Sequence, residues 1–317
     1  MLRVHDLQVR FCDAAGAFAA VDGISFELAP GESLALIGES GSGKSTIALS
    51  LLRLLPRTAH VSGRVELFGE DVLALPERSM TRVRGSRIAM VFHDPFAALN
   101  PVLRIGTQIA EVLRAHAGVG RRAAWAAAVE LLGRVGLAAD VAGRYAHQLS
   151  GGMRQRASIA MALACDPAIV VADEPTSSLD AVTQRQIVAV FQQLRRERNI
   201  GLLLATHDLD LAAEVCDHVA VLYAGRIVER GAPADVLSAA RHPYTAGLVR
   251  SLPPPLGEPT RARLSPIAGS APAPWARPTG CSFRDRCPRA MPDCATVPEL
   301  SGSADRAVAC FHPVEGQ

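Results

Sequence analysis

The chain has 317 residues, enough for one large domain with an appendage or for two modest domains. Apolar residues make up 49% and charged residues 20%, a composition typical of a globular chain rather than a disordered one. The formal net charge is only +2 and no stretch concentrates Lys or Arg, so we expect no nucleic-acid partner. No apolar run reaches the roughly 18 residues that cross a bilayer, and the N-terminal segment lacks the apolar core of a signal peptide. We therefore expect a cytosolic protein, with any membrane role coming through a partner.

The first third of the sequence predicts strands around a glycine-rich loop. Residues 1 to about 35 alternate apolar and polar side chains, as antiparallel strands do. Ser33 to Ile37 then reads as a buried strand, and the loop that follows it opens a helix from about Lys44 to Leu55, which stops before Pro56. Residues 61 to 92 suggest further strands.

The middle of the sequence turns from helices to a parallel sheet. Between about 100 and 155 the pattern is helical, with apolar residues at helical spacing from Arg121 to Val135. Ala168 to Ala172 and Gly201 to Ala205 are short apolar runs on either side of a helical stretch from about Ala181 to Glu197. Buried strands separated by helices indicate an α/β fold whose parallel sheet is covered on both faces.

The last 80 residues differ in character. Eight prolines lie between Pro253 and Pro278, so we read Leu252 to Thr279 as an extended linker or wrapping segment. Beyond it, four cysteines occur with the spacing C-x5-C-x6-C-x15-C. We expect this cysteine-rich region to form a small separate lobe.

The glycine-rich loop, GESGSGKS, has the spacing G-x-x-x-x-G-K-S between a strand and a helix. Its glycines let successive amide groups turn inward toward phosphate oxygens, and the start of the next helix adds its positive end. Lys44 would reach the β- and γ-phosphates, and the Ser45 hydroxyl would bind Mg²⁺. The sequence therefore predicts a nucleotide site formed by Gly38, Glu39, Ser40, Gly41, Ser42, Gly43, Lys44, Ser45 and Thr46.

Two carboxylates follow the apolar run that ends at Ala172. A buried strand that delivers Asp173 and Glu174 at its carboxyl end suits nucleotide hydrolysis. The first carboxylate can hold Mg²⁺, directly or through water, and the second can polarise an attacking water. Alone this pair is weak evidence, but with the glycine loop it predicts an ATPase.

The segment LSGGMRQ, which begins at Leu149, resembles the signature LSGGQ of the ATP-binding cassette (ABC) family. Its two glycines permit close backbone approach, and its serine can bond a phosphate at a helix N-terminus. The resemblance implies that this motif closes over nucleotide held by the opposite subunit of a dimer, through Leu149, Ser150, Gly151, Gly152 and Met153. It also implies a P-loop NTPase (RecA-like) core with an antiparallel β subdomain and a helical subdomain over about 98–158, all within residues 1–235.

The resemblance extends to three shorter motifs. Ser178, Leu179 and Asp180 match the loop that communicates between the two nucleotide sites, and His207 stands where the family places its switch histidine. His93 stands where the family carries a glutamine that senses Mg²⁺ and the attacking water. An imidazole is shorter and titratable, so the coupling of hydrolysis to transport is open at this position.

The adenine platform carries the weakest signal. Family members stack an aromatic residue from the N-terminal strands on the base, and Phe18 is our candidate, with Phe11 as the runner-up. Either ring would serve equally well as core packing.

Residues 236–317 resemble the C-terminal extension of one branch of the family, the ATPases of oligopeptide, dipeptide and nickel importers. The resemblance lies in RHPYTAGLVRS, in GCSFRDRCPRAMPDC and in ACFHP. It implies a peripheral protein at the cytoplasmic face of the inner membrane. Its partners would be a second ABC ATPase subunit, two membrane permeases and an extracytoplasmic substrate-binding protein.

The four cysteines have no C-x2-C pair of the kind that zinc ribbons present. Four thiolates without such pairs are compatible with a [4Fe–4S] cluster, which the resemblance favours, with zinc as the alternative and a metal-free or disulfide-bonded tail as a third reading. The residues concerned are Cys281, Cys287, Cys294 and Cys310.

Two other functions are weighed against a transport ATPase. A soluble cassette ATPase acting on DNA or ribosomes usually carries two cassettes or a long insertion, yet only about 105 residues separate Lys44 from Ser150 here. A non-hydrolysing regulatory cassette is disfavoured by the presence of Glu174 and His207. Which peptide, nickel ion or metal chelate is transported stays open.

Overall fold

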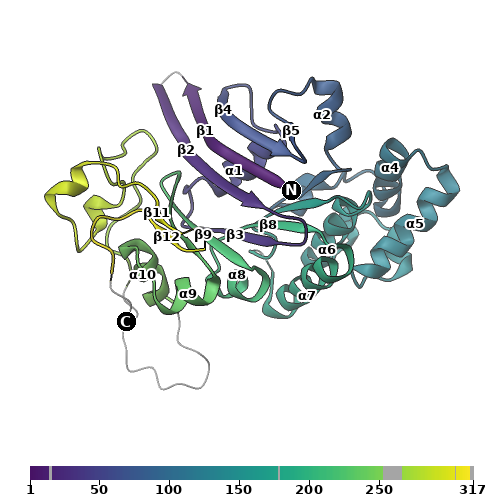
Figure 1. Ribbon diagram of the computed structural model, residues 1–317. Coiled ribbons are helices and arrows are strands. Elements are labelled where there is room, and N and C mark those ends of the chain that lie inside the picture. The colour runs from purple at the N-terminus through teal and green to yellow at the C-terminus, as the bar shows by residue number, and fades with distance from the viewer. Residues whose placement is uncertain (14–15, 178, 253–265, 304, 315–317) are drawn as a thin grey trace, which may run out of the picture.

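The computed structural model describes residues 1–13, 16–177, 179–252, 266–303 and 305–314. Two sheets with helices around them make up the fold, with the helices of residues 95–162 at one end of the molecule and the C-terminal residues at the other (Figure 1). Among the described residues, no helix combines the length and apolar character needed to span a membrane.

The smaller sheet is antiparallel and has the order β2-β1-β4-β5. It consists of β1 (Leu2–Asp13), β2 (Gly16–Leu28), β4 (Ala59–Leu67) and β5 (Glu70–Asp71). The prediction of antiparallel strands at the N-terminus is confirmed by the β1–β2 pairing.

The larger sheet has eight strands in the order β11-β12-β10-β9-β3-β8-β7-β6. Five of them run parallel, as predicted, from β9 to β6. The strands are β3 (Ser33–Ile37), β6 (Ile88–Val91), β7 (Ile169–Asp173), β8 (Gly201–Thr206), β9 (His218–Tyr223), β10 (Arg226–Gly231), β11 (Ser301–Gly302) and β12 (Ala307–Val308).

Strand β3 shows why this sheet is buried on both faces. Its alternate side chains enter two different hydrophobic clusters, because successive residues of a strand point to opposite faces. Leu34 and Leu36 pack with the first helix and the antiparallel sheet, while Ala35 and Ile37 pack on the other side. All five residues of β3 are buried, so the glycine-rich loop that follows it, residues 38–45 and called the phosphate loop below, is anchored in the core.

The α-helices fall into three groups along the chain. Two accompany the N-terminal sheets, α1 (Lys44–Leu51) and α2 (Glu77–Val83). The helical group that contains the signature motif holds α3 (Pro95–Ala98), α4 (Ile105–Ala117), α5 (Arg121–Arg134) and α6 (Gly151–Ala162). The remaining helices are α7 (Ala181–Arg198), α8 (Leu209–Val215), α9 (Pro233–Ser238) and α10 (Pro243–Arg250). Short 3₁₀ helices are η1 (Ala139–Gly143), η2 (Ala146–Gln148), η3 (Arg284–Arg286) and η4 (Pro292–Ala295).

Two expectations about elements need correction. Helix α1 ends at Leu51 rather than near Leu55, and α2 lies within a stretch read as strands. Helix α2 is short and begins directly after a proline, and only Met80 and Val83 face the core, which is too few for a periodic signal.

The expectation of a separate C-terminal lobe is wrong. Strand β12 pairs antiparallel with β10 through Glu229–Val308 and Arg230–Ala307, so the extension continues the main sheet. Residues 253–265 of the predicted linker lie outside the described residues, and the described residues 266–279 form neither helix nor strand.

Candidate functional site

The phosphate loop joins β3 to α1 in a conformation that its glycines permit. Gly41 and Gly43 have φ angles of 79° and 106°, which side chains rarely allow. Gly38 is required for space, since a Cβ there would lie 2.4 Å from the Leu222 carbonyl oxygen. The loop therefore packs against β9 and presents its backbone to the cavity described below.

Lys44 is buried at the start of α1. Its Nζ donates to the carbonyl oxygens of Gly38, at 2.7 Å, and Glu39, at 3.2 Å, and lies 3.7 Å from Oε1 of Glu174. Burial lowers the pKa of Lys44, while the charges of Glu174, Asp173 and Glu39 oppose that shift. These carboxylates therefore oppose the loss of positive charge from Lys44.

Asp173 and Glu174 end β7 in two different environments. The Ser45 hydroxyl donates to Oδ1 of Asp173 at 2.9 Å, which brings together the hydroxyl and the carboxylate predicted to hold Mg²⁺. Burial raises the pKa of Asp173, and the Ser45 hydrogen bond opposes this. Glu174 has a φ of 46°, and its amide donates to the Ala205 carbonyl oxygen at 2.8 Å. Non-glycine residues with a left-handed backbone are uncommon, and they occur most often at functional sites.

Both predicted histidines face this acid pair or its loop. His207 follows β8, and its Nδ1 lies 2.8 Å from Oε2 of Glu174. The Nδ1 of His93 lies 3.0 Å from the Ser177 hydroxyl, in the loop that follows Glu174. The fold thus brings residues from four strand ends to one place.

A cavity of about 980 Å³ collects these groups. Phe11 and Phe18 lie at its wall, stacked with ring centroids 5.6 Å apart, so both adenine candidates border the same space. Sequence reasoning missed Leu248 and Pro274, which also line the cavity, and Trp275, whose ring meets the edge of Phe18 at 6.2 Å. The local sequence signal for these residues was a tryptophan within a proline-rich segment. The cavity lining consists of Phe11, Phe18, Ala20, the loop residues 38–46, His93, Asp173, Glu174, Ser177, His207, Leu248 and Pro274.

The signature residues do not belong to that lining, as far as the described residues go. Ser150 caps α6 by accepting the Met153 amide at 3.3 Å. Gly152 packs on α7, because a Cβ there would lie 2.2 Å from Cγ2 of Thr183. Leu149 is buried, and the other signature residues are partly or fully exposed. Their exposure at a helix N-terminus, away from this chain's own cavity, suits a site completed by another molecule.

Two residues of the communicating loop, Leu179 and Asp180, are described by the structure. Asp180 caps α7, accepting the amides of Val182 and Thr183 at 3.1 and 3.0 Å. Leu179 lies against Gly151 of the signature helix, 3.7 Å from where a Cβ would stand. Ser178 lies outside the described residues.

The four C-terminal cysteines line one small cavity, of about 10 Å³, together with Phe283 and His242. Burial raises the pKa of the Cys310 thiol to about 11, and the other three thiols add to this shift. The Cys281 amide donates to the Cys294 carbonyl oxygen at 3.0 Å, which closes the turn around the thiols. One nearby group, Asp293, Cys294 and His312, has ligand atoms within 4.8 Å of one another. His312 and Asp293 also form an ion pair at 2.8 Å.

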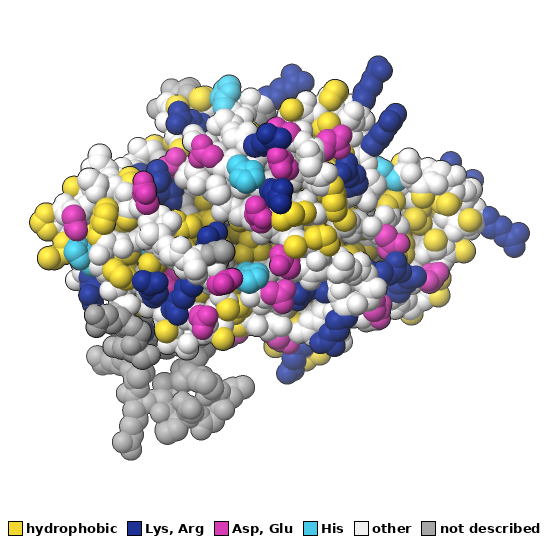
Figure 2. All heavy atoms as spheres, viewed as in Figure 1, with side chains coloured by type: hydrophobic (Ala, Val, Ile, Leu, Met, Phe, Trp, Pro, Cys, Tyr) yellow, Lys and Arg dark blue, Asp and Glu magenta, His cyan; other side chains and the backbone are white. Residues whose placement is uncertain are grey.

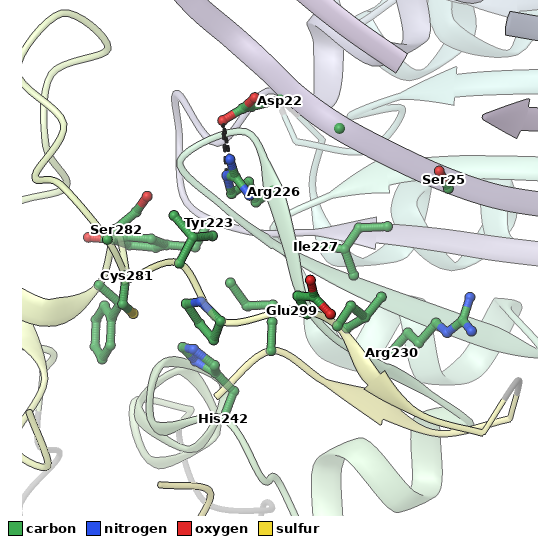
Figure 3. Close-up of a pocket in the computed structure, with 18 residues that line it drawn as sticks. Asp22, Ser25, Tyr223, Arg226, Ile227, Arg230, His242, Cys281, Ser282 and Glu299 are labelled. Carbon is green, nitrogen blue, oxygen red and sulfur yellow. Dashed lines mark hydrogen bonds and ion pairs between the residues drawn. The ribbon is translucent and has the colours of Figure 1, made fainter. Parts of the chain in front are cut away.

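A separate cavity of about 410 Å³ lies where β2 and β10 meet the C-terminal residues. Figure 3 shows Arg226 tied to Asp22 on one side, with Tyr223, Cys281 and Ser282 gathered on the other. It contains none of the predicted nucleotide-site residues.

Comparison with known proteins agrees with this geometry. Residues 21–177 match the ABC transporter family, and residues 228–294 match the family described as the oligopeptide/dipeptide transporter C-terminal region. A protein of Brucella melitensis is 46% identical over 95% of this chain and 93% of its own length. The oligopeptide transport ATP-binding protein OppD of Salmonella typhimurium is 42% identical, over 99% of this chain and 94% of its own.

Solved structures give the same fold. The ATP-binding cassette MJ0796, in a dimeric post-hydrolysis state with ADP and phosphate, superposes with a TM-score of 0.67 at 26% identity. The match covers 74% of this chain and 99% of that one. This chain therefore belongs to the ABC transporter family as an ATP-binding subunit with the oligopeptide/dipeptide transporter C-terminal region, and its activity is that of a transport ATPase.

Proposed function

We propose that the chain powers the import of dipeptides or oligopeptides from the cytoplasmic face of the inner membrane. Support comes from relatives such as OppD of Salmonella typhimurium and the dipeptide transport ATP-binding protein DppD of Haemophilus influenzae, which is 41% identical over the whole of this chain. The assembly would contain a second ATPase subunit, in our view a paralogue, two permeases and an extracytoplasmic binding protein. Acidic and basic side chains are interspersed on the face in Figure 2, which favours this reading over a nucleic-acid partner.

The observation that carries the mechanism is the convergence of Lys44, Asp173, Glu174 and His207 on one cavity. The loop amides and Lys44 bind the β- and γ-phosphates, and the Ser45 hydroxyl and Asp173 would hold Mg²⁺. When bound, Mg²⁺ neutralises charge that builds on the transferring phosphoryl group. Glu174 accepts the proton of the attacking water, and His207 orients Glu174 through the 2.8 Å contact. Phe18 stacks on adenine.

The second half of the site comes from a partner cassette. Its signature residues would cover the γ-phosphate from the open side of the cavity, and Ser150, Gly151 and Gly152 of this chain do the same for the partner. Closure on ATP and reopening after hydrolysis would be transmitted through the helical group of residues 95–162 to the permeases.

We propose that the four C-terminal cysteines bind metal, as a [4Fe–4S] cluster rather than zinc. The donor set of four thiols suits either metal. The spacing C-x5-C-x6-C-x15-C lacks the C-x2-C pairs that zinc ribbons present, which favours the cluster. A cluster here would crosslink the segments of the C-terminal extension through their cysteines.

Uptake by the assembled importer tests the transport function. The chain would be reconstituted in vesicles with its permeases, second cassette and binding protein, and labelled dipeptide, oligopeptide and nickel would be offered separately. We expect ATP-dependent peptide uptake that Glu174→Gln abolishes and Glu197→Gln, a surface change on α7, leaves intact. Uptake of nickel alone, or ATP hydrolysis without any peptide uptake, would reject the substrate proposed.

Metal analysis of the full chain purified without oxygen tests the cysteine site. We expect about four iron atoms per chain and absorbance at about 400 nm, both lost in Cys287→Ser but kept in Cys165→Ser. Stoichiometric zinc without iron would reject the cluster.

A further inference from the structure

The C-terminal extension makes a direct ionic contact with the phosphate loop. Arg286, in η3 and directly before Cys287, forms a two-pronged ion pair with Glu39, the second residue of the loop. Its Nη1 lies 2.7 Å from Oε2 and its Nη2 lies 3.1 Å from Oε1. The Arg286 side chain is only 8% exposed, so solvent screens this pair less than it screens surface pairs.

The guanidinium is fixed on its other sides as well. Its Nε donates to the Ala268 carbonyl oxygen at 3.0 Å, and Nη1 also donates to the Tyr223 hydroxyl at 3.3 Å. It lies 5.8 Å from the ring centres of Tyr223 and Phe283. Figure 3 shows Tyr223, at the end of β9, next to the extension residues Cys281 and Ser282. Arg286 is thus placed by the core and the extension together.

Glu39 is held at its backbone too. Its amide donates to the hydroxyl of Tyr244, from α10, at 2.9 Å. Arg286 therefore binds the side chain of Glu39, and Tyr244 binds its main chain. Both residues follow the ATPase core in sequence.

A carboxylate in this loop needs an explanation, because the loop receives a polyphosphate. Glu39 lines the nucleotide cavity, and its charge acts on Lys44, where it opposes the effect of burial on the pKa of that lysine. Left unpaired, it would repel the phosphates at short range in a partly desolvated site. Paired with Arg286, it presents no net charge and a fixed position.

We propose that Arg286 is a positioning residue of the ATP site, which acts through Glu39 by neutralising the charge of this carboxylate beside the phosphate-binding groups of the loop. The affinity for ATP then depends on the C-terminal extension. This inference rests on the proposed role of the phosphate loop. A purely structural ion pair, which only attaches the extension to the core, is the competing reading.

Binding of ATP with Mg²⁺ to the full chain separates the two readings. Measured by calorimetry in a Glu174→Gln background that prevents turnover, Arg286→Ala should raise Kd about tenfold, equivalent to about 1.4 kcal/mol. The double change Glu39→Ala, Arg286→Ala should return Kd to within about threefold of the parent, because the unpaired carboxylate is gone. Arg284→Ala is the matched control, since Arg284 lies in the same turn and its side chain hydrogen-bonds Asp285 and the Thr279 carbonyl oxygen.

An unchanged Kd in Arg286→Ala overturns the proposal, and so does a double variant that binds as poorly as Arg286→Ala. If Arg286→Ala fails to fold by circular dichroism, Glu39→Gln decides instead. That variant should bind ATP as tightly as the parent or up to about threefold more tightly, since Arg286 then leaves a net positive charge. Weaker binding by Glu39→Gln contradicts the proposal.

Lys44→Ala keeps this test apart from that of the proposed function. If Lys44→Ala loses ATP binding while Arg286→Ala does not, the nucleotide-binding role of the loop is supported. Only the proposed role of Arg286 is then rejected. If Lys44→Ala binds ATP as the parent does, the proposed nucleotide site itself is wrong.

Discussion

Glu174 differs from its neighbour Asp173 in every contact that matters for catalysis. Asp173 faces the Ser45 hydroxyl, whereas Glu174 lies between His207 and Lys44. Its φ of 46° turns the side chain away from the direction of β7 and into the cavity. The two adjacent carboxylates thus face different partners, which suits the separate roles proposed for them.

Replacing Glu174 with glutamine should lower ATP turnover at least about a hundredfold without weakening ATP binding. The amide keeps the shape but cannot accept the proton of the attacking water. Phosphate release and calorimetric binding would be measured on the same preparation, with Glu197→Gln as the control. Turnover within about threefold of the parent would assign the proton acceptor to another group.

His93 occupies the position where a glutamine was expected from the resemblance. It contacts Ser177, one residue before the communicating loop, rather than Glu174. The imidazole therefore links the helical group to the loop that follows β7.

His93→Gln should keep or raise the ATP turnover of the assembled complex, because glutamine can span the same gap and carries no titratable charge. The assay is phosphate release by the complete importer with its binding protein. A large loss of turnover would instead show that the imidazole has a specialised role.

At the scale of elements, the start of α10 joins the core to the extension. His242 caps this helix, with Nδ1 accepting the Tyr244 amide at 3.1 Å, while its own amide donates to buried Glu229 at 2.8 Å. Burial lowers the pKa of His242 to about 3. The folded chain therefore keeps this imidazole neutral.

This buried histidine should make the fold acid-sensitive. Above pH 6.5 His242 is neutral both folded and unfolded and adds no pH dependence. Below it, only the unfolded chain takes up the proton, so the free energy of unfolding falls by about 1.4 kcal/mol per pH unit down to about pH 3. Urea unfolding at pH 7, 6, 5 and 4, after metal removal from both proteins, should show a shallower decline for His242→Asn, which can still cap the helix. Equal slopes of the free energy of unfolding against pH in the two proteins would show that His242 does not cause the acid sensitivity.

The signature motif and the communicating loop are also in contact with each other. Gly152 of α6 fits against Thr183 of α7, and Leu179 of the communicating loop fits against Gly151 of α6, so the two motifs lie side by side. Movement of one helix is expected to move the other, which would link the two nucleotide sites of the proposed dimer mechanically.

For the whole molecule, the central fact is that the site is open on one side. The signature residues lie outside the lining of this chain's own cavity, within the described residues. This arrangement supports the proposed dimer, in which each chain would hold one half of each of two sites.

ATP turnover per chain should accordingly rise with protein concentration for the isolated subunit and remain slow. Phosphate release would be followed over a hundredfold range of concentration, with sedimentation at the same concentrations to report association. Lys44→Ala serves as the inactive control. Fast turnover that is independent of concentration in a monomer would contradict a shared site.

Much of the site could be predicted from contiguous residues. The glycine loop, the acid pair after β7 and the signature motif each work through local backbone geometry, so a short run of sequence determines their chemistry. The α/β class followed for the same reason, since periodicity within a strand or helix is local.

Only the tertiary structure decided how distant segments meet. Arg286 reaches Glu39 across 247 residues, and Trp275 reaches Phe18 across a similar span. These contacts depend on β3 lying beside β9, β9 beside β10, and β10 beside β12. Strand order is a property of the packed sheet and leaves no periodic trace in the sequence. What the sequence alone determined is therefore the nucleotide chemistry, and what the structure added is that the C-terminal extension forms part of its surroundings.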